Sequence, residues 1–492
     1  MNAYKNITYI LTLVIILGMF TQCSNWLDLE PENDLIEDDF WKKSEDVEAV
    51  LSSAYTSWRN NTLNNLIMGE IRGDNVQFNG SAFTNYNRIA QSDISTTNPM
   101  TNWSGYYRTI NLANIILYYA PLVLERDPTF TIAQKESIEA EALFLRSLSY
   151  FYLVRLWKEV PLVLNPMISD TVNVFLPKSS ENQALNQIAS DLRYAETIAY
   201  RDELMDNPAY YKGRANLYSI QTLLADIYLW QEKYEECIEY CNKIITSGKF
   251  SLEDQNNWFN LFYPGNSMRE SIFEIQYSTA FQQYNPIYHN VVRLGAGNPV
   301  INMVSTDILS SLYETTDIRL LNDADVPFPQ AIPANKYASK GLIFTRRLPT
   351  ENDANLISYR YPEVLLMKAE ALIELGGNNQ EVNDILSMIS DRASGLFEGI
   401  GDTEALRLAV LNERAREFAG EGKRWFDILR YAKRNNYQRK NFIINMILAN
   451  AGVQQRPILE ARLTDVMSYY LPIHEDELMY NPQLVQNPFY DR

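Results

Sequence analysis

The chain has 492 residues, of which 61 are acidic and 43 basic, and its formal charge is −18. This excess of carboxylates repels phosphate backbones, so nucleic acid is not an expected partner. The two histidines, His289 and His474, are far apart in the sequence, and they support neither a His-rich zinc site nor a catalytic triad. We therefore expect no cofactor. A structural calcium stays open for Asp323 and Asp325, although the rest of a twelve-residue calcium loop is missing and a solvated loop is the simpler interpretation.

The N-terminus begins with one cation and an apolar run over residues 7–20. This run is shorter than the roughly 20 residues of a membrane-spanning helix, and it predicts a signal peptide over residues 1–22. Cys23 stands where a bacterial lipoprotein signal places its acylated residue, and the acidic residues that follow predict a solvated tether over 23–45. Gln22 departs from the usual small residue before the cysteine, so an ordinary signal peptide with an incidental cysteine remains the alternative.

Helical spacing of apolar residues dominates the rest of the chain and predicts a mainly α fold built from helix pairs. The clearest segments are 132–157, 182–199, 214–246, 362–375 and 404–433. The second half of the 214–246 segment has the spacing of a tetratricopeptide repeat, carried by Leu224, Ala225, Tyr228, Tyr234 and Cys237.

A second helix pair begins near residue 363, and Gly376 and Gly377 are expected to end its first helix. Cys237 and Cys241 are four residues apart on one helix, where the distance between Cβ atoms exceeds that of a disulfide. We expect both to be buried thiols.

Two long irregular regions, about 74–100 and 258–350, interrupt the helices. Short strands are expected in 271–278 and around 469–473. Both regions carry aromatic residues in polar surroundings without helical periodicity, and such side chains favour contact with a ligand. The candidates for ligand binding are Phe83, Tyr86, Phe281, Tyr284 and Tyr288, with Phe78 as a further aromatic of the same kind.

The segment ERAREFAGEGKRWFDILRY repeats Glu413, Glu417 and Glu421 at helical spacing beside arginines. Paired carboxylates can act as acid and base in glycosidases. The simpler interpretation is a scaffold helix with i,i+4 charge pairs, whose residues Phe418, Trp425, Phe426 and Leu429 face the core.

Six ordered blocks together resemble the SusD/RagB family of outer-membrane nutrient-binding lipoproteins of Bacteroidetes. The six blocks are CSNWLDLEPEND, NWSGYYRTINLANIIL, EAEALFLRSLSYFYLVRLW, GRANLYSIQTLLADIYLWQEKYEECIEYC, YRYPEVLLMKAEALIELG and LNERAREFAGEGKRWFDILRY. The segment LPIHEDELMYNPQLVQNPFY is in addition similar to the end of the family's sequences. The resemblance implies one SusD-like helical domain over 46–492, with tetratricopeptide-like helices, no catalytic residues and ligand loops that vary among members.

The resemblance also implies a protein that is lipid-anchored on the cell surface at the outer membrane. It would form the lid of a SusC-like TonB-dependent transporter and deliver an oligosaccharide to it. Two other functions stay open. The same scaffold can capture peptides through polar loop groups such as Asn79, Asn85 and Gln283, or the chain can be an α-helical glycoside hydrolase or lyase.

Overall fold

The computed structural model describes residues 40–79, 84–168, 173, 175–200, 208–262, 265, 267–287, 302–319, 353–449 and 451–491. The signal peptide, Cys23, Phe83, Tyr288, Asp323 and Asp325 lie outside these residues, as does the side chain of Phe78. The predicted acylation, the domain boundaries and the proposed roles of these residues therefore remain predictions.

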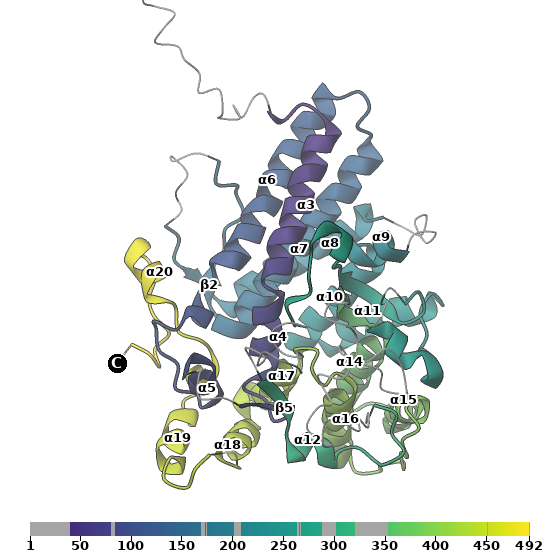
Figure 1. Ribbon diagram of the computed structural model, residues 1–492, viewed down its shortest axis with the longest axis vertical. Helices are drawn as coiled ribbons and strands as arrows, with labels where there is room; N and C mark the ends of the chain where they lie inside the picture. Colours follow the sequence, from purple (N-terminus) through teal and green to yellow (C-terminus); the bar gives the residue numbers. More distant parts are fainter. Residues whose placement is uncertain are drawn as a thin grey trace, which may run out of the picture.

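The described part of the chain is mainly helical, as predicted (Figure 1). Three long helices, α3 (Ser44–Asn60), α6 (Ser104–Arg126) and α7 (Ile132–Trp157), stand together in the upper half of the view, and α8 (Glu181–Ile198) packs against α7. The helices that follow are α9 (Pro208–Gly213), α10 (Leu217–Trp230), α11 (Tyr234–Thr246), α12 (Asp307–Ser311), α14 (Tyr361–Glu374), α15 (Asn379–Arg392), α16 (Thr403–Glu417), α17 (Arg424–Tyr437), α18 (Lys440–Ala449), α19 (Arg456–Leu463) and α20 (Glu475–Tyr480). Two short helices, α4 (Thr62–Glu70) and α5 (Thr84–Ala90), come early in the chain, and 3₁₀ turns occur at Pro99–Thr101, Gln255–Leu261, Thr279–Phe281 and Val466–Tyr469.

The two predicted helix pairs are confirmed. Helices α10 and α11 pack together, and α14 packs against both α11 and α15. Helix α14 ends because Gly376 takes a positive φ of 69°, after which the N–H of Gly377 donates to the carbonyl of Leu372 at 2.9 Å. Glycine is favoured at such a position because it has no Cβ to clash in the left-handed region.

The segment predicted as one helix over 404–433 is two helices, α16 and α17. Gly420 and Gly422 in the connection have positive φ angles of 78° and 76°, which end the helical path. Gly422 also lies against α4, since a Cβ added to Gly69 would sit 1.8 Å from the Gly422 carbonyl oxygen. The break therefore lets two backbones approach one another.

The strands are short and antiparallel. The strand predicted in 271–278 is confirmed as β4 (Ser271–Ile275), which pairs with β6 (Leu356–Arg360). The two predicted irregular regions are joined by an unpredicted ladder, in which β1 (Val76–Asn79) pairs with β5 (Asn302–Ser305). A third, two-residue pair joins β2 (Val160–Pro161) to β3 (Lys178–Ser179).

The prediction of a strand around 469–473 is wrong, because the structure has no strand there. These residues lie buried against the end of α7, where the N–H of Leu471 donates to the carbonyl of Leu156 at 2.8 Å. Pro472 has no N–H to offer a ladder, and its carbonyl accepts the indole N–H of Trp157 at 2.9 Å.

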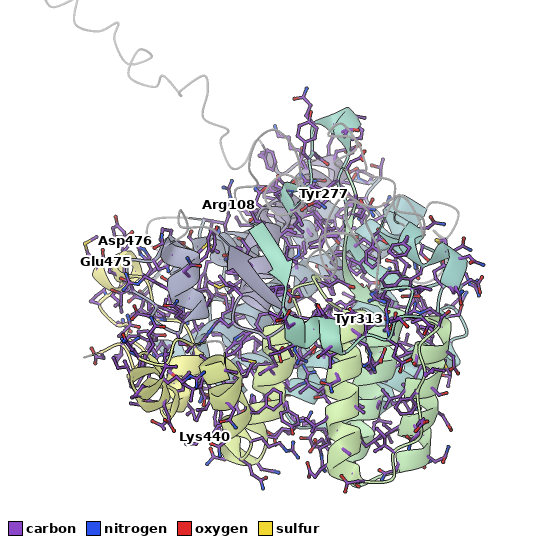
Figure 2. All side chains as sticks on the ribbon, turned by 60° about the horizontal axis from the view of Figure 1, so that its bottom comes forward. Arg108, Tyr277, Tyr313, Lys440, Glu475 and Asp476 are labelled. Carbon is purple, nitrogen blue, oxygen red and sulfur yellow. The ribbon has the colours of Figure 1, made fainter. Side chains whose placement is uncertain are left out.

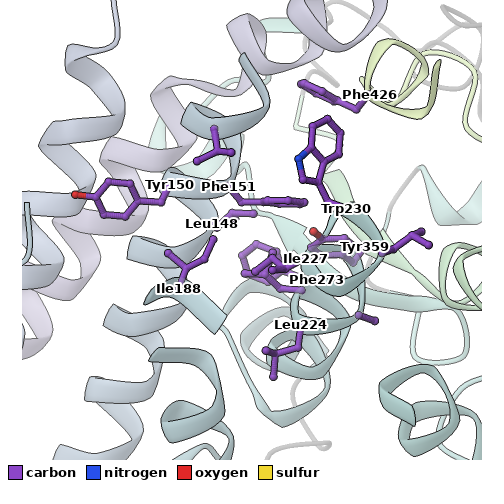
Figure 3. Packing of buried hydrophobic residues seen from close by; sticks show 14 of the residues in the cluster. Leu148, Tyr150, Phe151, Ile188, Leu224, Ile227, Trp230, Phe273, Tyr359 and Phe426 are labelled. Carbon is purple, nitrogen blue, oxygen red and sulfur yellow. The ribbon is translucent and has the colours of Figure 1, made fainter. Parts of the chain in front are cut away.

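One large core connects the helices to the β4–β6 pair. Side chains of α7, α10, α17 and both strands meet there, with Trp230, Phe273 and Phe426 among them (Figure 3). The predicted core residues of the 413–429 segment are buried, namely Phe418, Trp425, Phe426 and Leu429, and Cys237 and Cys241 are buried free thiols as expected. Trp41 is also buried and stacks on Tyr119 of α6 at 4.3 Å, which fixes the start of the described chain to the helical bundle. None of the helices in the described residues is long and apolar enough to cross a bilayer.

Candidate functional site

A short hairpin over residues 278–283, called here the 278–283 hairpin, presents the most exposed of the candidate aromatics that the structure describes. Ser278 and Gln283 exchange backbone hydrogen bonds of 2.9 and 2.8 Å, and Gln282 closes the turn in the left-handed region with φ 56°. Phe281 is 78% exposed and Tyr284, directly after the hairpin, is 49% exposed. The exposure of both rings in a polar turn agrees with the sequence prediction.

The hairpin is held from two sides. Arg59 of α3 donates to Oε1 of Gln283 at 2.8 Å. On the other side, the hydroxyl of Thr279 donates to Asp353 at 3.0 Å, and the side chain of Asn285 donates to the carbonyl of Ala354 at 2.7 Å. Tyr277, which leads into the hairpin and is labelled in Figure 2, is buried. The two exposed rings therefore stand on a backbone that is fixed by hydrogen bonds.

Tyr86 differs from its predicted setting. It lies on helix α5 and not in a loop, and it is half-buried, because part of its ring packs against the main core. Burial raises the pKa of its hydroxyl. Tyr86 therefore offers a ligand less surface than Phe281 or Tyr284 does.

A cavity of about 200 Å³ opens beside α5, and sequence reasoning missed it. It is called here the α5–α19 cavity, since its walls come from α5, from one end of the β1–β5 ladder, and from α18 and α19. Figure 2 shows this ladder facing the viewer, with α18 and α19 beside it. The polar side chains that line the cavity are Arg72, Asn87, Gln91, Thr306 and Gln455, and the apolar ones are Ile71, Val76, Ala90, Met446, Ile447, Ala451 and Leu459.

Arg72 is buried at the wall of this cavity. Its guanidinium lies 4.2 Å from the ring centre of Trp425 and donates to the carbonyls of Ser468 and Tyr469 at 2.9 and 2.6 Å. Burial lowers the pKa of Arg72 to about 10. The only sequence signal for this role was a cation between Glu70 and Asp74, and such a signal is weak.

The acidic segment at the end of α16 is structural. Glu413 and Glu417 are buried, and Arg319 binds them at 2.6 and 2.8 Å. Burial acts to raise the pKa of Glu417, but the charges of Arg392, Arg360 and Arg319 outweigh it and lower the pKa well below its usual value. Arg360 also binds Glu421 and Glu270.

The interpretation of this segment as scaffold is confirmed, but the expected i,i+4 partners are wrong. The arginines that neutralise these carboxylates come from β6, α15 and the segment after α12. Among the described residues, only the Arg416–Glu413 pair is local to the helix. None of these carboxylates, Glu270, Glu413, Glu417 and Glu421, lines the α5–α19 cavity.

Comparison with known proteins agrees with this architecture. A family model described as "SusD family" matches residues 331–490, and one described as "Starch-binding associating with outer membrane" matches residues 25–229. Two SusD-like proteins of Formosa agariphila are similar along their length. One is 25% identical with 99% of each chain covered, and the other is 24% identical with 88% of this chain and 93% of the relative covered.

Solved structures share the fold. A SusD superfamily protein of Bacteroides thetaiotaomicron has a TM-score of 0.71 at 21% identity and covers 92% of this chain and 99% of its own. Surface glycan-binding protein A of Bacteroides uniformis has a TM-score of 0.69 at 23% identity and covers 90% and 99%. The chain belongs to the SusD/RagB family, and the resemblance in its sequence blocks is confirmed.

Proposed function

We propose that this protein binds oligosaccharides at the cell surface and delivers them to a SusC-like TonB-dependent transporter as its lid. The observation that carries the proposal is the pair of exposed rings, Phe281 and Tyr284, on a hairpin fixed by hydrogen bonds. A pyranose ring has an apolar face of C–H groups and a rim of hydroxyls, so an aromatic ring can cover its face while amide side chains bind its rim. The similarity to a surface glycan-binding protein of Bacteroides uniformis supports this class of ligand.

The proposal includes the location. The protein is anchored to the outer membrane by lipid on Cys23 and faces outward. The family model described as associating with the outer membrane supports this location, and it matches the chain from residue 25, two residues after the proposed acylated cysteine. Two or more acyl chains are enough for a stable anchor.

The affinity of the isolated protein follows from the area that such rings can cover. A platform of about 200–300 Å² of apolar surface contributes roughly 5–7 kcal/mol at about 25 cal/mol/Å². Association costs at least several kcal/mol in lost translational and rotational freedom, so the net Kd is about micromolar to millimolar. Weak binding suits a lid that must release its cargo to a transporter.

Titration calorimetry of the purified mature protein against a panel of neutral and acidic oligosaccharides tests the proposal. We expect saturable, weak binding of at least one glycan and no release of shorter products during incubation. Product release would instead support the hydrolase or lyase alternative. Binding of peptides without binding of any glycan would support the peptide alternative.

A further inference from the structure

The α5–α19 cavity has an unusual charge for this protein. The chain as a whole carries 61 acids against 43 bases, yet the cavity is lined by one arginine and by no aspartate or glutamate among the residues that the structure describes. Three amide side chains, those of Asn87, Gln91 and Gln455, add groups that can donate and accept hydrogen bonds. A wall of this kind favours an anion over a cation.

Arg72 has no acidic partner among the residues that the structure describes. It forms no ion pair in the described part of the chain, and its Nη1 and Nη2 bond to backbone carbonyls while its Nε has no hydrogen-bond acceptor. Arg72 is only 3% exposed, so its guanidinium is a buried charge that no carboxylate of the described residues balances. Buried charges are normally paired, because desolvating an isolated charge is costly.

The helices on one side of the cavity add positive charge. Residues 433–462 contain six lysines and arginines and only one acid, Glu460. Several of these cations bind carboxylates, but Lys440 and Arg456 form no ion pair in the part of the chain that the structure describes. Figure 2 places Lys440 at the outer side of α18, which borders the cavity. Two cations on this side of the cavity, Lys440 and Arg456, therefore have no carboxylate partner among the described residues.

The size of the cavity limits the ligand. Its volume of about 200 Å³ is more than tenfold the roughly 10–15 Å³ that a single ordered water requires. An organic group with several polar atoms fits this space better than one buried solvent molecule does. The apolar residues between the amides suit the C–H face of a sugar ring.

We propose that the α5–α19 cavity binds the carboxylate of a uronic acid residue, so that the protein selects acidic oligosaccharides. This inference rests on the proposed function and names the substrate class. The carboxylate supplies the negative charge that Arg72 lacks, and the three amides bind the hydroxyls of the same sugar. The net negative charge of the protein does not prevent this binding, because the described residues that line the cavity include an arginine and no carboxylate, and salt screens more distant charges.

The first test uses matched ligands. Oligogalacturonate, oligomannuronate and oligoguluronate are titrated into the full mature protein, each beside its carboxyl-reduced form. We expect at least one acid form to bind roughly tenfold more tightly than its reduced form, and this advantage to shrink as salt is added. Equal binding of the acid and reduced forms overturns the inference and leaves the proposed function standing. Binding of no oligosaccharide overturns both.

The second test uses matched variants at the exposed Gln455 and its neighbour Gln454, of which only Gln455 lines the cavity. Gln455→Glu places a negative charge at the wall and should weaken binding of the acid form roughly three- to tenfold, while Gln455→Lys should strengthen it. Gln454→Glu makes the same change in net charge outside the cavity and should have a much smaller effect. Equal effects of Gln455→Glu and Gln454→Glu would overturn the inference, as would tighter binding of an acidic peptide than of any uronate.

Discussion

Phe281 and Tyr284 expose their rings, while neighbouring side chains are hydrogen-bonded to Arg59, Asp353 and Ala354. A large ring at the surface gains little for folding, since burial is what stabilises an aromatic side chain. Its removal should therefore change binding more than stability. This combination separates residues that contact a ligand from residues that support the fold.

At this scale we expect Tyr284→Ala and Phe281→Ala each to weaken binding of the cognate oligosaccharide by roughly three- to tenfold, because each removes one stacking face. Calorimetry measures the change in Kd. Tyr194→Ala is the matched control, since Tyr194 is 54% exposed on α8 and belongs to neither the hairpin nor the cavity. Unchanged affinity in both hairpin variants would place the stacking platform elsewhere.

Trp425 is buried, whereas Phe281 and Tyr284 are exposed, and we expect it to support the fold and not to contact a ligand. It is fully buried on α17, and its ring carries the guanidinium of Arg72. We expect Trp425→Ala to destabilise the protein by about 3–5 kcal/mol, because it leaves a cavity and removes the face on which Arg72 rests. Denaturant unfolding measures the loss. A variant with the stability of the wild type but no glycan binding would show that Trp425 serves the ligand and not the fold.

At the scale of elements, buried ion pairs join α14 to α17. Glu370 of α14 binds Nε and Nη2 of Arg430 at 2.7 and 2.8 Å, and it also binds Arg434. Burial acts to raise the pKa of Glu370, but the charges of Arg430 and Arg434 outweigh it and lower the pKa to about 2. The ionised carboxylate therefore stabilises the contact between the two helices.

The sign of the pH effect follows from this lowered pKa. The stabilising contribution of Glu370 is fully present above its pKa in the unfolded chain, about 4.5, and is lost as the pH falls through about 2. We expect Glu370→Gln to cost about 3–5 kcal/mol near neutral pH, because it leaves two arginines without their shared partner. Urea unfolding at several pH values measures the difference between wild type and variant, which should shrink below about pH 4.5. A difference that stays constant down to about pH 2 would contradict this assignment.

At the scale of the whole molecule, the described chain begins on the helical bundle. Trp41 stacks on Tyr119, and the backbone N–H of Ser44 donates to Asp127 at 2.9 Å. A tether that starts at Cys23 would join the membrane to this end of the long helices. The location of the protein then depends on one residue outside the described chain.

We expect a radiolabelled fatty acid to mark the wild-type protein in cells and not the Cys23→Ala variant, because the thiol of Cys23 is the proposed acceptor of the acyl chain. The variant should also appear outside the membrane fraction. Cys237→Ala is the control, since Cys237 is a buried thiol of the core. Equal labelling of Cys23→Ala and wild type would refute the anchor.

The sequence alone predicted the helices well, since an apolar stripe or a helix-ending glycine depends on neighbours a few positions away. The bounds of α7 match the prediction at both ends, and Gly376 ends α14 as expected. Local pattern also separated core aromatics such as Trp425 from exposed ones such as Phe281.

Only the tertiary structure decided which distant groups meet. The α5–α19 cavity combines residues from the first 91 positions with Thr306 and with others beyond position 445. The carboxylates of α16 bind arginines from other parts of the chain. Arg424 similarly reaches Asp74 across 350 positions of sequence. No periodicity within one segment encodes such a pairing, because it depends on how complete helices pack and on which charges that packing removes from water.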